Sequence, residues 1–440
     1  MLEMPEQAPG PPGDPPPSSG VPSVSPNLPL DTVAVIGLGY IGLPTAAVLA
    51  QAGKTVIGVD VSRATVDAIN AGTVPFVEEG LETVVAGTVA QGKLSAQTGT
   101  PRADAYIVSV PTPFKGDHDA DLSYIEAAAK GIAPQLSGGE LVVLESTSPP
   151  GATQFMAEVI LGLRADLTME PNLPNSLYFS HAPERVLPGR IMIEMVENDR
   201  IIGGLSTEAA ELNRDLYASF CTGELLLTEA RTAEMAKLTE NAFRDVNIAF
   251  ANELSIIAER QGIDVWELIE LANHHPRVNI LQPGPGVGGH CIAVDPWFIV
   301  SADRENAKLI AAARGVNDSK PEAVLAKVLE RAGRLKHPTI AALGLAFKAN
   351  IDDLRESPSK NIAVALTERL AEGTVLVVEP NIDALPPEFD GHDNVEFAEL
   401  HDAVQRADIV LLLVDHDPFR TLDREELQEK VVIDTKGLWR

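Results

Sequence analysis

Cys291 stands at the end of a glycine-rich loop, in the run Gly286-Val287-Gly288-Gly289-His290-Cys291. Glycines let a backbone turn tightly and approach a ligand closely. Asp295 follows four residues later, so a helical turn that began at Cys291 would place both side chains on one face and the thiol at a helix amino terminus. That position lowers the pKa of a thiol and favours a thiolate nucleophile. A lone cysteine is also often a small buried apolar side chain, and the residues alone leave both interpretations open.

A second glycine loop predicts an oxidant for such chemistry. Gly37-Leu38-Gly39-Tyr40-Ile41-Gly42 follows the apolar run 33–36 and precedes an apolar segment with helical character. Glycines in this pattern permit a tight turn, close approach to a pyrophosphate and packing of the helix on the strand. Asp60 ends the next strand, where a carboxylate accepts hydrogen bonds from ribose hydroxyls and repels a ribose phosphate. The loop therefore predicts NAD rather than NADP, although Arg63 leaves some tolerance of a phosphate open.

A long helical pattern from about Glu229 to Arg260 carries Lys237, Asn241 and Arg244 at spacings of four and three, hence on one face. This face either lines a cleft or is simply solvated, and in the solvated case Glu234 and Lys237 form a surface pair of little energy.

Two further polar segments are weak signals by themselves. Glu184 and Arg185 lie between prolines in the run 181–189, which alone favours a solvated loop. His274 and His275 are adjacent, but no further ligand spacing accompanies them, so we expect no metal site.

Alternating strand and helix patterns place these loops in an α/β fold. We expect a disordered Pro-rich tail at 1–30, which holds ten prolines, and an NAD-binding Rossmann domain at 31–225. A central helical and dimerisation domain with the cysteine loop follows at 226–325, and a second Rossmann-like domain at 326–440. The predicted fold class is thus two doubly wound parallel-sheet domains joined by a helical domain with a long spine helix.

Composition limits the partners and the compartment. The formal net charge of -29 argues against nucleic-acid or anionic-membrane binding, since both need a positive field. Two cysteines, Cys221 and Cys291, cannot make a disulfide framework, and no Lys or Arg precedes Lys54, as a secretory signal would require. We expect a cytoplasmic protein.

With these loops and the Lys237 helix in chain order, the sequence from about Thr32 to its end resembles the UDP-glucose/GDP-mannose dehydrogenase family. The run 284–299 around Cys291, the run 182–189 and the run 238–247 are similar to those of members that oxidise UDP-N-acetyl-D-mannosamine. The resemblance implies a four-electron oxidation by NAD, in which Cys291 holds the aldehyde as a thiohemiacetal and then as a thioester. It also implies a UDP-sugar substrate and a homodimer.

The resemblance assigns roles to individual residues. The implied catalytic residues are Cys291, Lys237, Asn241, Asp295, Glu184 and Thr147. The implied cofactor contacts are Gly37, Gly39, Tyr40, Ile41, Gly42, Asp60, Thr112, Thr147 and Arg355. The implied substrate contacts are Arg185, Val186, Lys237, Asn241, Arg244, His275, Arg277, Gly288, Phe347, Lys348 and Lys436, of which the segment with His275 and Arg277 can come from the neighbouring subunit.

Departures from the family pattern reduce the number of candidate sugar substrates. Many UDP-glucose enzymes have a lysine directly before the aspartate, where this chain has Val294, and a Phe-Leu after the Pro-Glu pair, where this chain has Arg185-Val186. Both departures favour an N-acetylated sugar. The alternatives are UDP-N-acetylglucosamine, UDP-glucose or GDP-mannose as substrate, a two-electron hydroxyacid dehydrogenase, and an NAD-binding module without catalysis.

Overall fold

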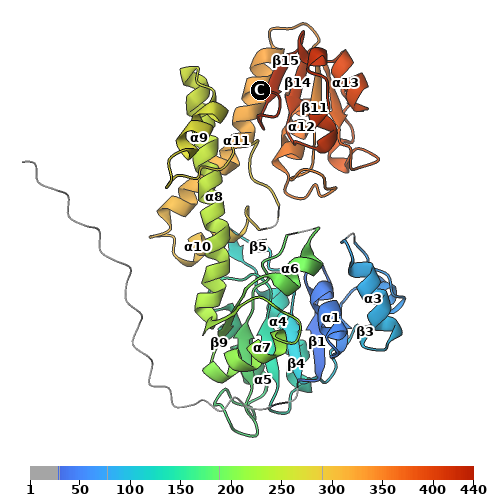
Figure 1. The fold of residues 1–440 in the computed structure, drawn as a ribbon, viewed down its shortest axis with the longest axis vertical. Helices are drawn as coiled ribbons and strands as arrows, with labels where there is room; N and C mark the ends of the chain where they lie inside the picture. Colours follow the sequence, from blue (N-terminus) through green and yellow to red (C-terminus); the bar gives the residue numbers. More distant parts are fainter. Residues whose placement is uncertain (1–27, 29, 77, 188, 290) are drawn as a thin grey trace, which may run out of the picture.

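The computed structural model describes residues 28, 30–76, 78–187, 189–289 and 291–440, so the predicted tail lies almost wholly outside the described residues. Two sheets lie at opposite ends of a long helix (Figure 1). Within the described ranges, no helix combines the length and the apolarity needed to cross a membrane.

The first sheet has the strand order β10-β9-β8-β7-β4-β1-β2-β3, and every neighbouring pair is parallel except β8 with β9. Its central strands β1, β4 and β7 are apolar because helices cover both faces. The strands are β1 (Thr32–Ile36), β2 (Thr55–Val59), β3 (Leu94–Gln97), β4 (Ala105–Val108), β7 (Leu141–Leu144), β8 (Tyr178–His181), β9 (Arg200–Gly204) and β10 (Leu225–Glu229).

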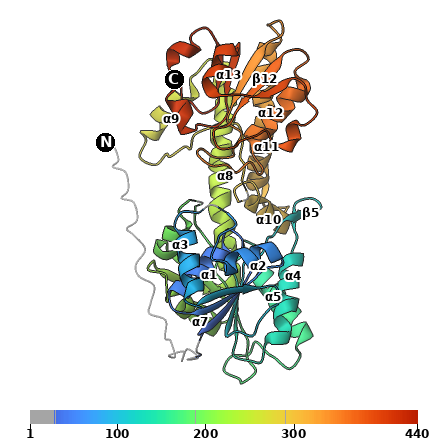
Figure 2. The same cartoon turned by 90° about the vertical axis from the view of Figure 1, so that its right-hand side faces the viewer.

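Helices on the two faces bury separate apolar clusters, as Figure 2 shows from the side. One face is covered by α1 (Gly42–Gln51), α2 (Arg63–Asn70), α3 (Leu81–Ala90) and α7 (Thr207–Tyr217), and α6 (Ile191–Glu197) packs on α1. The other face is covered by α4 (Ser123–Ile132) and α5 (Ala152–Leu163). The strand order reverses between β1 and β4, and such a reversal opens a crevice at the carboxyl ends of the strands, where ligands bind.

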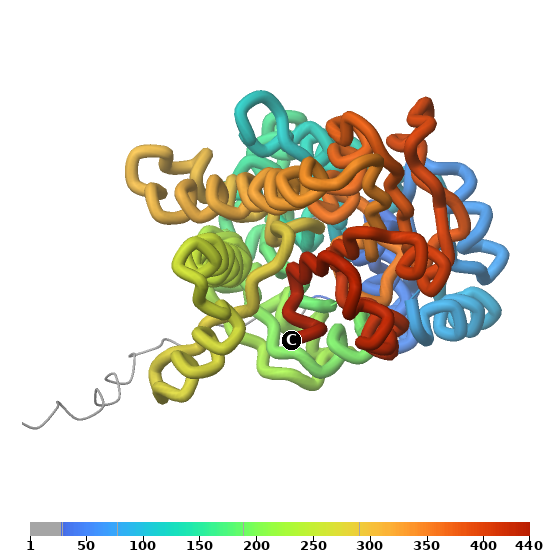
Figure 3. The backbone as a smooth tube through the Cα atoms, turned by 90° about the horizontal axis from the view of Figure 1, so that it is seen from above, coloured from blue at the N-terminus to red at the C-terminus, as the bar shows by residue number. Residues whose placement is uncertain are grey.

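The spine helix α8 (Ala230–Gln261) agrees within one residue with its predicted bounds. It is followed by α9 (Val265–Asn273), α10 (Asp295–Ala302) and α11 (Lys308–Ala332). Figure 3 looks down α8 and shows α11 crossing next to it. The two helices share a buried polar seam in which Asp245 pairs with Arg314 at 2.6 Å and Asn252 donates to Asn317 at 2.9 Å.

A small hairpin of the first domain contacts the spine. Its strands are β5 (Phe114–Lys115) and β6 (Asp119–Ala120), and Phe114 packs against Phe298 of α10 at 5.5 Å between ring centroids. The Arg304 guanidinium binds Asp117 at 2.7 Å and Asp119 at 3.3 Å. The hairpin therefore ties the first domain to the helix that follows Cys291.

The second sheet is parallel throughout, in the order β13-β12-β11-β14-β15. Ser357 caps its first helix by accepting a hydrogen bond from Lys360 N. The elements are β11 (Thr339–Leu343), α12 (Pro358–Arg369), β12 (Thr374–Val378), β13 (Val395–Phe397), α13 (Leu400–Arg406), β14 (Ile409–Leu412), α14 (Asp417–Arg420) and β15 (Val431–Asp434), with short 3₁₀ turns at Ala133–Gln135, Pro387–Phe389 and Arg424–Leu427. Two Rossmann-like domains joined by a helical domain confirm the predicted fold class.

Candidate active site

The loop between β1 and α1 has the geometry expected of a dinucleotide site. Gly37 has φ +93°, and a Cβ there would lie 2.2 Å from Ser109 O. A Cβ on Gly42 would lie 1.9 Å from Gly37 O, whereas a Cβ on Gly39 would meet nothing within 4 Å. Two glycines are therefore required by packing, and the third leaves the backbone open to a pyrophosphate.

Asp60 lies directly after β2, beside this loop. Its carboxylate accepts hydrogen bonds from Leu38 N at 3.0 Å and Ser62 N at 2.8 Å, which fix its orientation. Arg63 is exposed and lies 3.7 Å from Asp67. The open glycine and the oriented carboxylate fit NAD.

Other predicted cofactor residues lie around the same crevice. The Thr112 hydroxyl donates to Thr147 O at 2.5 Å, which joins the loops after β4 and β7. Tyr40 is 44% exposed, and the guanidinium of Arg355, from the second Rossmann-like domain, lies 5.3 Å from its ring centroid. Arg355 thus reaches the first domain at Tyr40, next to Ile41. Asp353 holds the Arg355 guanidinium at 2.6 Å.

Cys291 and Asp295 lie one helical turn apart, as predicted, because Cys291 O accepts a hydrogen bond from Asp295 N at 2.8 Å. Asp295 is 2% exposed and accepts from Asn241 Nδ2 at 2.5 Å. Burial raises the pKa of Asp295 to about 6, against the Asn241 hydrogen bond and the Lys237 charge. Helix α8 therefore brings Lys237 and Asn241 to the two residues at the start of α10.

The expected lowering of the Cys291 pKa is wrong for this structure. Cys291 is an exposed free thiol at the surface of its loop, yet the protein packed around its sulfur raises its pKa. The negative charge of Asp295 raises the pKa further, and the nearby charge of Lys237 lowers it. Burial and the carboxylate one turn away both raise the pKa of Cys291, so Lys237 is the group that favours the thiolate.

The solvated interpretation of the Lys237 face is wrong at Lys237, although Arg244 on the same face is exposed. Lys237 is 9% exposed and Glu234 is 1% exposed. Glu234 makes no surface pair with Lys237: its carboxylate accepts from Gly151 N at 2.5 Å, Thr153 N at 2.8 Å and Thr153 Oγ1 at 2.6 Å. It caps the start of α5 and attaches the spine helix to the first domain.

The second Rossmann-like domain packs directly on the glycine loop before Cys291. A Cβ on Gly288 would lie 2.5 Å from Glu356 O and 3.0 Å from Phe347 Cβ. Lys436 Nζ would lie 4.0 Å from a Cβ on Gly284, and it pairs with Asp415 at 3.4 Å. Phe347 thus lies beside Gly288, and Lys436 lies beside Gly284 of the same loop. Lys348 follows Phe347 and has an exposed side chain.

Glu184 belongs to a buried charge cluster rather than to a solvated loop. It is 8% exposed, and its carboxylate pairs with Arg200 at 2.7 Å. Arg185, the next residue, turns outward and binds Glu240 of α8 at 2.7 Å. The interpretation of this segment as solvated therefore fails at Glu184, because Arg200 of β9 compensates the charge.

The remaining predicted substrate residues are more dispersed. Val186 packs on Ile191 and Met195 of α6. Arg244 is exposed on α8, and His275 and Arg277 are exposed after α9, which follows the end of α8 remote from the first sheet (Figure 1).

Three residues around Glu184 were not predicted from the sequence as site residues. Glu145 follows β7 and accepts hydrogen bonds from three hydroxyl groups, while Arg200 and Tyr217 flank it from β9 and α7. Glu145 directly precedes the Ser146-Thr147 pair and ends an apolar strand, where a buried acid needs partners. No local sequence pattern marks Arg200 or Tyr217 as part of a site.

Comparison with known proteins identifies all three parts of the chain. Models of the UDP-glucose/GDP-mannose dehydrogenase family match its NAD binding domain at 31–221, its central domain at 231–319 and its UDP binding domain at 341–440.

Curated relatives match over nearly the whole length. An NDP-N-acetyl-D-galactosaminuronic acid dehydrogenase of Ralstonia nicotianae is 56% identical, with 93% of this chain and 96% of the relative covered. A UDP-N-acetyl-D-mannosamine dehydrogenase of Salmonella typhi is 54% identical, with 93% and 99% covered. The solved UDP-D-ManNAc dehydrogenase of Pyrococcus horikoshii is 38% identical, with a TM-score of 0.82 and 93% and 96% covered. The chain therefore belongs to the UDP-glucose/GDP-mannose dehydrogenase family and is an NAD-dependent UDP-sugar dehydrogenase.

Proposed function

We propose that this enzyme oxidises UDP-N-acetyl-D-mannosamine to UDP-N-acetyl-D-mannosaminuronate in two successive steps, each with one NAD. The observation that carries the proposal is the group formed by Cys291, Lys237, Asn241 and Asp295, which α8, the turn that holds Cys291 and the start of α10 bring together. A nucleophilic thiol beside an oxidant distinguishes a four-electron oxidation from a single hydride transfer.

NAD, when bound at the Gly37–Gly42 loop, accepts a hydride at each oxidation step. In the first step the primary alcohol of the sugar loses this hydride and a proton and becomes an aldehyde. The Cys291 thiolate then adds to the aldehyde carbon, which gives a thiohemiacetal. Loss of a second hydride and of the hydroxyl proton gives a thioester, and water cleaves the thioester to a carboxylate and free Cys291.

We assign a role to each of the other predicted catalytic residues. Lys237 stabilises the thiolate and the oxyanion, and Asn241 donates to the oxyanion while it holds Asp295. Asp295 orients the attacking water, and Glu184 is the candidate base for aldehyde formation or hydrolysis. Thr147 accepts a hydrogen bond from the Thr112 hydroxyl through its carbonyl oxygen, and we assign its hydroxyl to the catalytic water by the family resemblance.

Basic side chains from three parts of the chain supply the charge that a UDP-sugar pyrophosphate needs. Lys436 lies beside the glycine loop that precedes Cys291, Arg185 lies in the first domain, and Arg244 lies on α8. These local cations explain how a chain of net charge -29 binds a dianionic nucleotide.

The proposal also specifies which sugar the UDP substrate carries. The relative of 54% identity is named for UDP-N-acetyl-D-mannosamine, and the relative of 56% identity is named for N-acetyl-D-galactosaminuronic acid. UDP-N-acetylgalactosamine is therefore the second candidate. Both are N-acetylated, in accord with Val294 in place of a lysine.

A substrate panel tests this assignment. Initial rates of NADH formation are measured with the UDP derivatives of N-acetylmannosamine, N-acetylgalactosamine, N-acetylglucosamine and glucose, and we expect the highest kcat/KM with the first. A higher value with UDP-N-acetylgalactosamine replaces the leading candidate by the second. Cys291→Ser is expected to form no acid, whereas the matched variant Cys221→Ser retains acid formation.

We also propose that the enzyme is a homodimer and works in the cytoplasm. On α8, Phe243, Phe250 and Ile257 recur every seven residues and are 71%, 51% and 49% exposed. An exposed apolar stripe on a long helix is typical of a helix–helix interface. Sedimentation is expected to give the mass of a dimer, and Phe243→Glu with Phe250→Glu to give a monomer; a monomeric wild-type chain would refute this part.

A further inference from the structure

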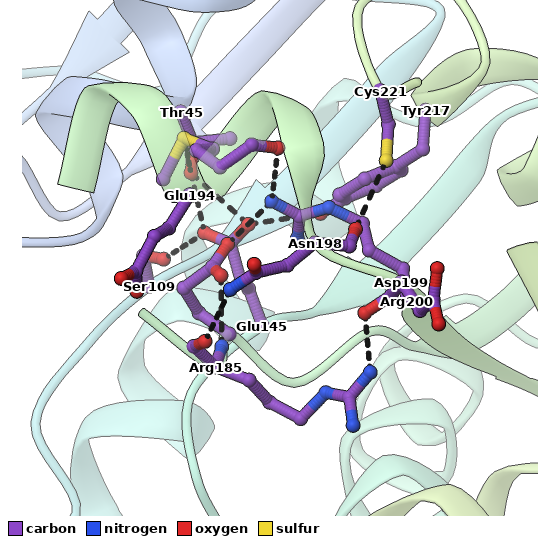
Figure 4. Close-up of polar contacts among 12 residues, drawn as sticks. Thr45, Ser109, Glu145, Arg185, Glu194, Asn198, Asp199, Arg200, Tyr217 and Cys221 are labelled. Carbon is purple, nitrogen blue, oxygen red and sulfur yellow. Dashed lines mark hydrogen bonds and ion pairs between the residues drawn. The ribbon is translucent and has the colours of Figure 1, made fainter. Parts of the chain in front are cut away.

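Glu145 lies at the point where four segments of the first domain meet (Figure 4). It is 1% exposed. Its carboxylate accepts hydrogen bonds from Thr45 Oγ1 of α1 at 3.0 Å, Ser109 Oγ after β4 at 2.5 Å and Tyr217 OH of α7 at 2.9 Å. Glu145 therefore connects the carboxyl ends of β4 and β7 to the helices on one face of the sheet.

Charges around Glu145 are unbalanced when every acid is ionised. The titratable groups that face it in the described structure are Glu184, Arg200 and Tyr217. Arg200 pairs with Glu184 at 2.7 Å, so a single cation serves two buried carboxylates. Burial, followed by the charge of Glu184, raises the pKa of Glu145 to about 7, against the Ser109 hydrogen bond and the charge of Arg200.

Both protonation states of Glu145 can be satisfied in place. A carboxylate accepts from all three hydroxyl groups, and a protonated carboxyl donates to one of them after that hydroxyl rotates. A change of charge therefore needs no unfolding of the cluster.

Ser109 connects this cluster to the dinucleotide loop. Gly37 is in contact with the Ser109 backbone, since a Cβ there would lie 2.2 Å from Ser109 O. A Cβ on Gly42 would lie 3.0 Å from Ser109 Cβ. Ser109 therefore donates a hydrogen bond to Glu145 and also contacts the glycine loop.

We propose that Glu145 is a positioning residue that couples the charge of the buried Glu184–Arg200 pair to the dinucleotide loop, so that NAD binding takes up a proton near neutral pH. This inference deepens the proposed function and rests on its NAD site alone, not on the sugar. When Glu145 is protonated, the Glu184–Arg200 ion pair leaves no net charge in the cluster beside the dinucleotide loop. Ionised Glu145 adds a buried negative charge below the place where the pyrophosphate binds, and repulsion weakens the affinity for NAD.

The direction of the pH effect follows from linkage. If NAD binds better when Glu145 is protonated, bound NAD raises the pKa of Glu145, and the affinity for NAD falls as pH rises through about 7. Each unit by which the pKa shifts on binding changes the dissociation constant by about tenfold across that range.

The test is the Kd of NAD, measured by calorimetry on the full chain without sugar between about pH 6 and about pH 8. We expect the wild-type Kd to rise with pH and the Kd of Glu145→Gln to stay level, because the amide keeps the shape and has no proton to exchange. The same slope in both proteins would overturn the proposal.

Glu140→Gln is the matched control. Glu140 is also buried, at 7% exposure, but lies at the opposite end of β7, where it accepts from Ser137 N and Gly138 N. We expect this variant to keep the wild-type slope; a level profile here would also overturn the proposal, because loss of any buried acid would then suffice.

A second variant keeps the test decisive if Glu145→Gln does not fold. Ser109→Ala removes the hydrogen bond to Glu145 and leaves the carboxyl in place, so the slope is expected to shrink, and an unchanged slope would contradict the coupling. Because these measurements use NAD alone, they give a result even where the sugar panel yields no turnover.

Discussion

Replacing Asn241 by alanine is expected to shift the acid limb of the pH profile of kcat/KM to higher pH. Asn241 Nδ2 donates to the Asp295 carboxylate at 2.5 Å, and Asp295 is 2% exposed. The bond stabilises the ionised form of Asp295 more than the protonated form. Hydrogen bonds to charged groups contribute about 1.5–3 kcal/mol, and one pKa unit corresponds to about 1.36 kcal/mol.

The loss of this bond therefore raises the pKa of Asp295 by about one to two units above its value of about 6. In the proposed mechanism Asp295 acts as a carboxylate, so activity is present above its pKa and lost as pH falls through it. The limb is expected near pH 6 in the wild type and roughly between pH 7 and pH 8 in Asn241→Ala.

The assay is kcat/KM for NADH formation as a function of pH. The position of the limb is the readout, because Asn241 also contacts the oxyanion and its loss lowers the plateau. Asn247→Ala is the control, since Asn247 lies on the same helix and donates to Phe243 O at 2.8 Å instead. A limb that stays at the wild-type position in Asn241→Ala would refute the role of Asp295.

Two further predictions concern the charges around Cys291 and the contact of Glu234 with α5. Asp295→Asn is expected to speed the alkylation of Cys291 by iodoacetamide and Lys237→Met to slow it, because the two charges shift the thiol pKa in opposite directions; equal effects on the labelling rate would contradict this. Glu234→Ala leaves two amides and a hydroxyl at the start of α5 without their acceptor and is expected to lower the free energy of unfolding by about 2–4 kcal/mol in urea titrations. Glu158→Ala, at an exposed acid of α5, is expected to change it little.

Much of the fold could be predicted because its signals are local. The apolar strands and the glycine loop at Gly37 to Gly42 follow from hydrophobic runs and turn residues, and the bounds of α8 follow from helical periodicity. Cys291 and Asp295 follow from spacing, and the structure places them one turn apart.

Residues whose environment depends on distant segments were predicted poorly. Glu184 and Glu234 are charged, and charge alone favours solvent, but Arg200 and the start of α5 receive them in the interior. The pKa of Cys291 depends on Asp295 and Lys237 at once, and spacing gives no measure of which charge dominates. A local sequence pattern does not show which distant residue will neutralise a buried charge.

The stoichiometry of NADH tests the central claim most directly. Wild-type enzyme is incubated with excess NAD and a limiting amount of UDP-N-acetyl-D-mannosamine, and NADH and uronic acid are counted at completion. Two NADH and one carboxylate per sugar are predicted, because Cys291 retains the aldehyde until the second oxidation. One NADH per sugar, with an aldehyde or ketone as product, would contradict the account.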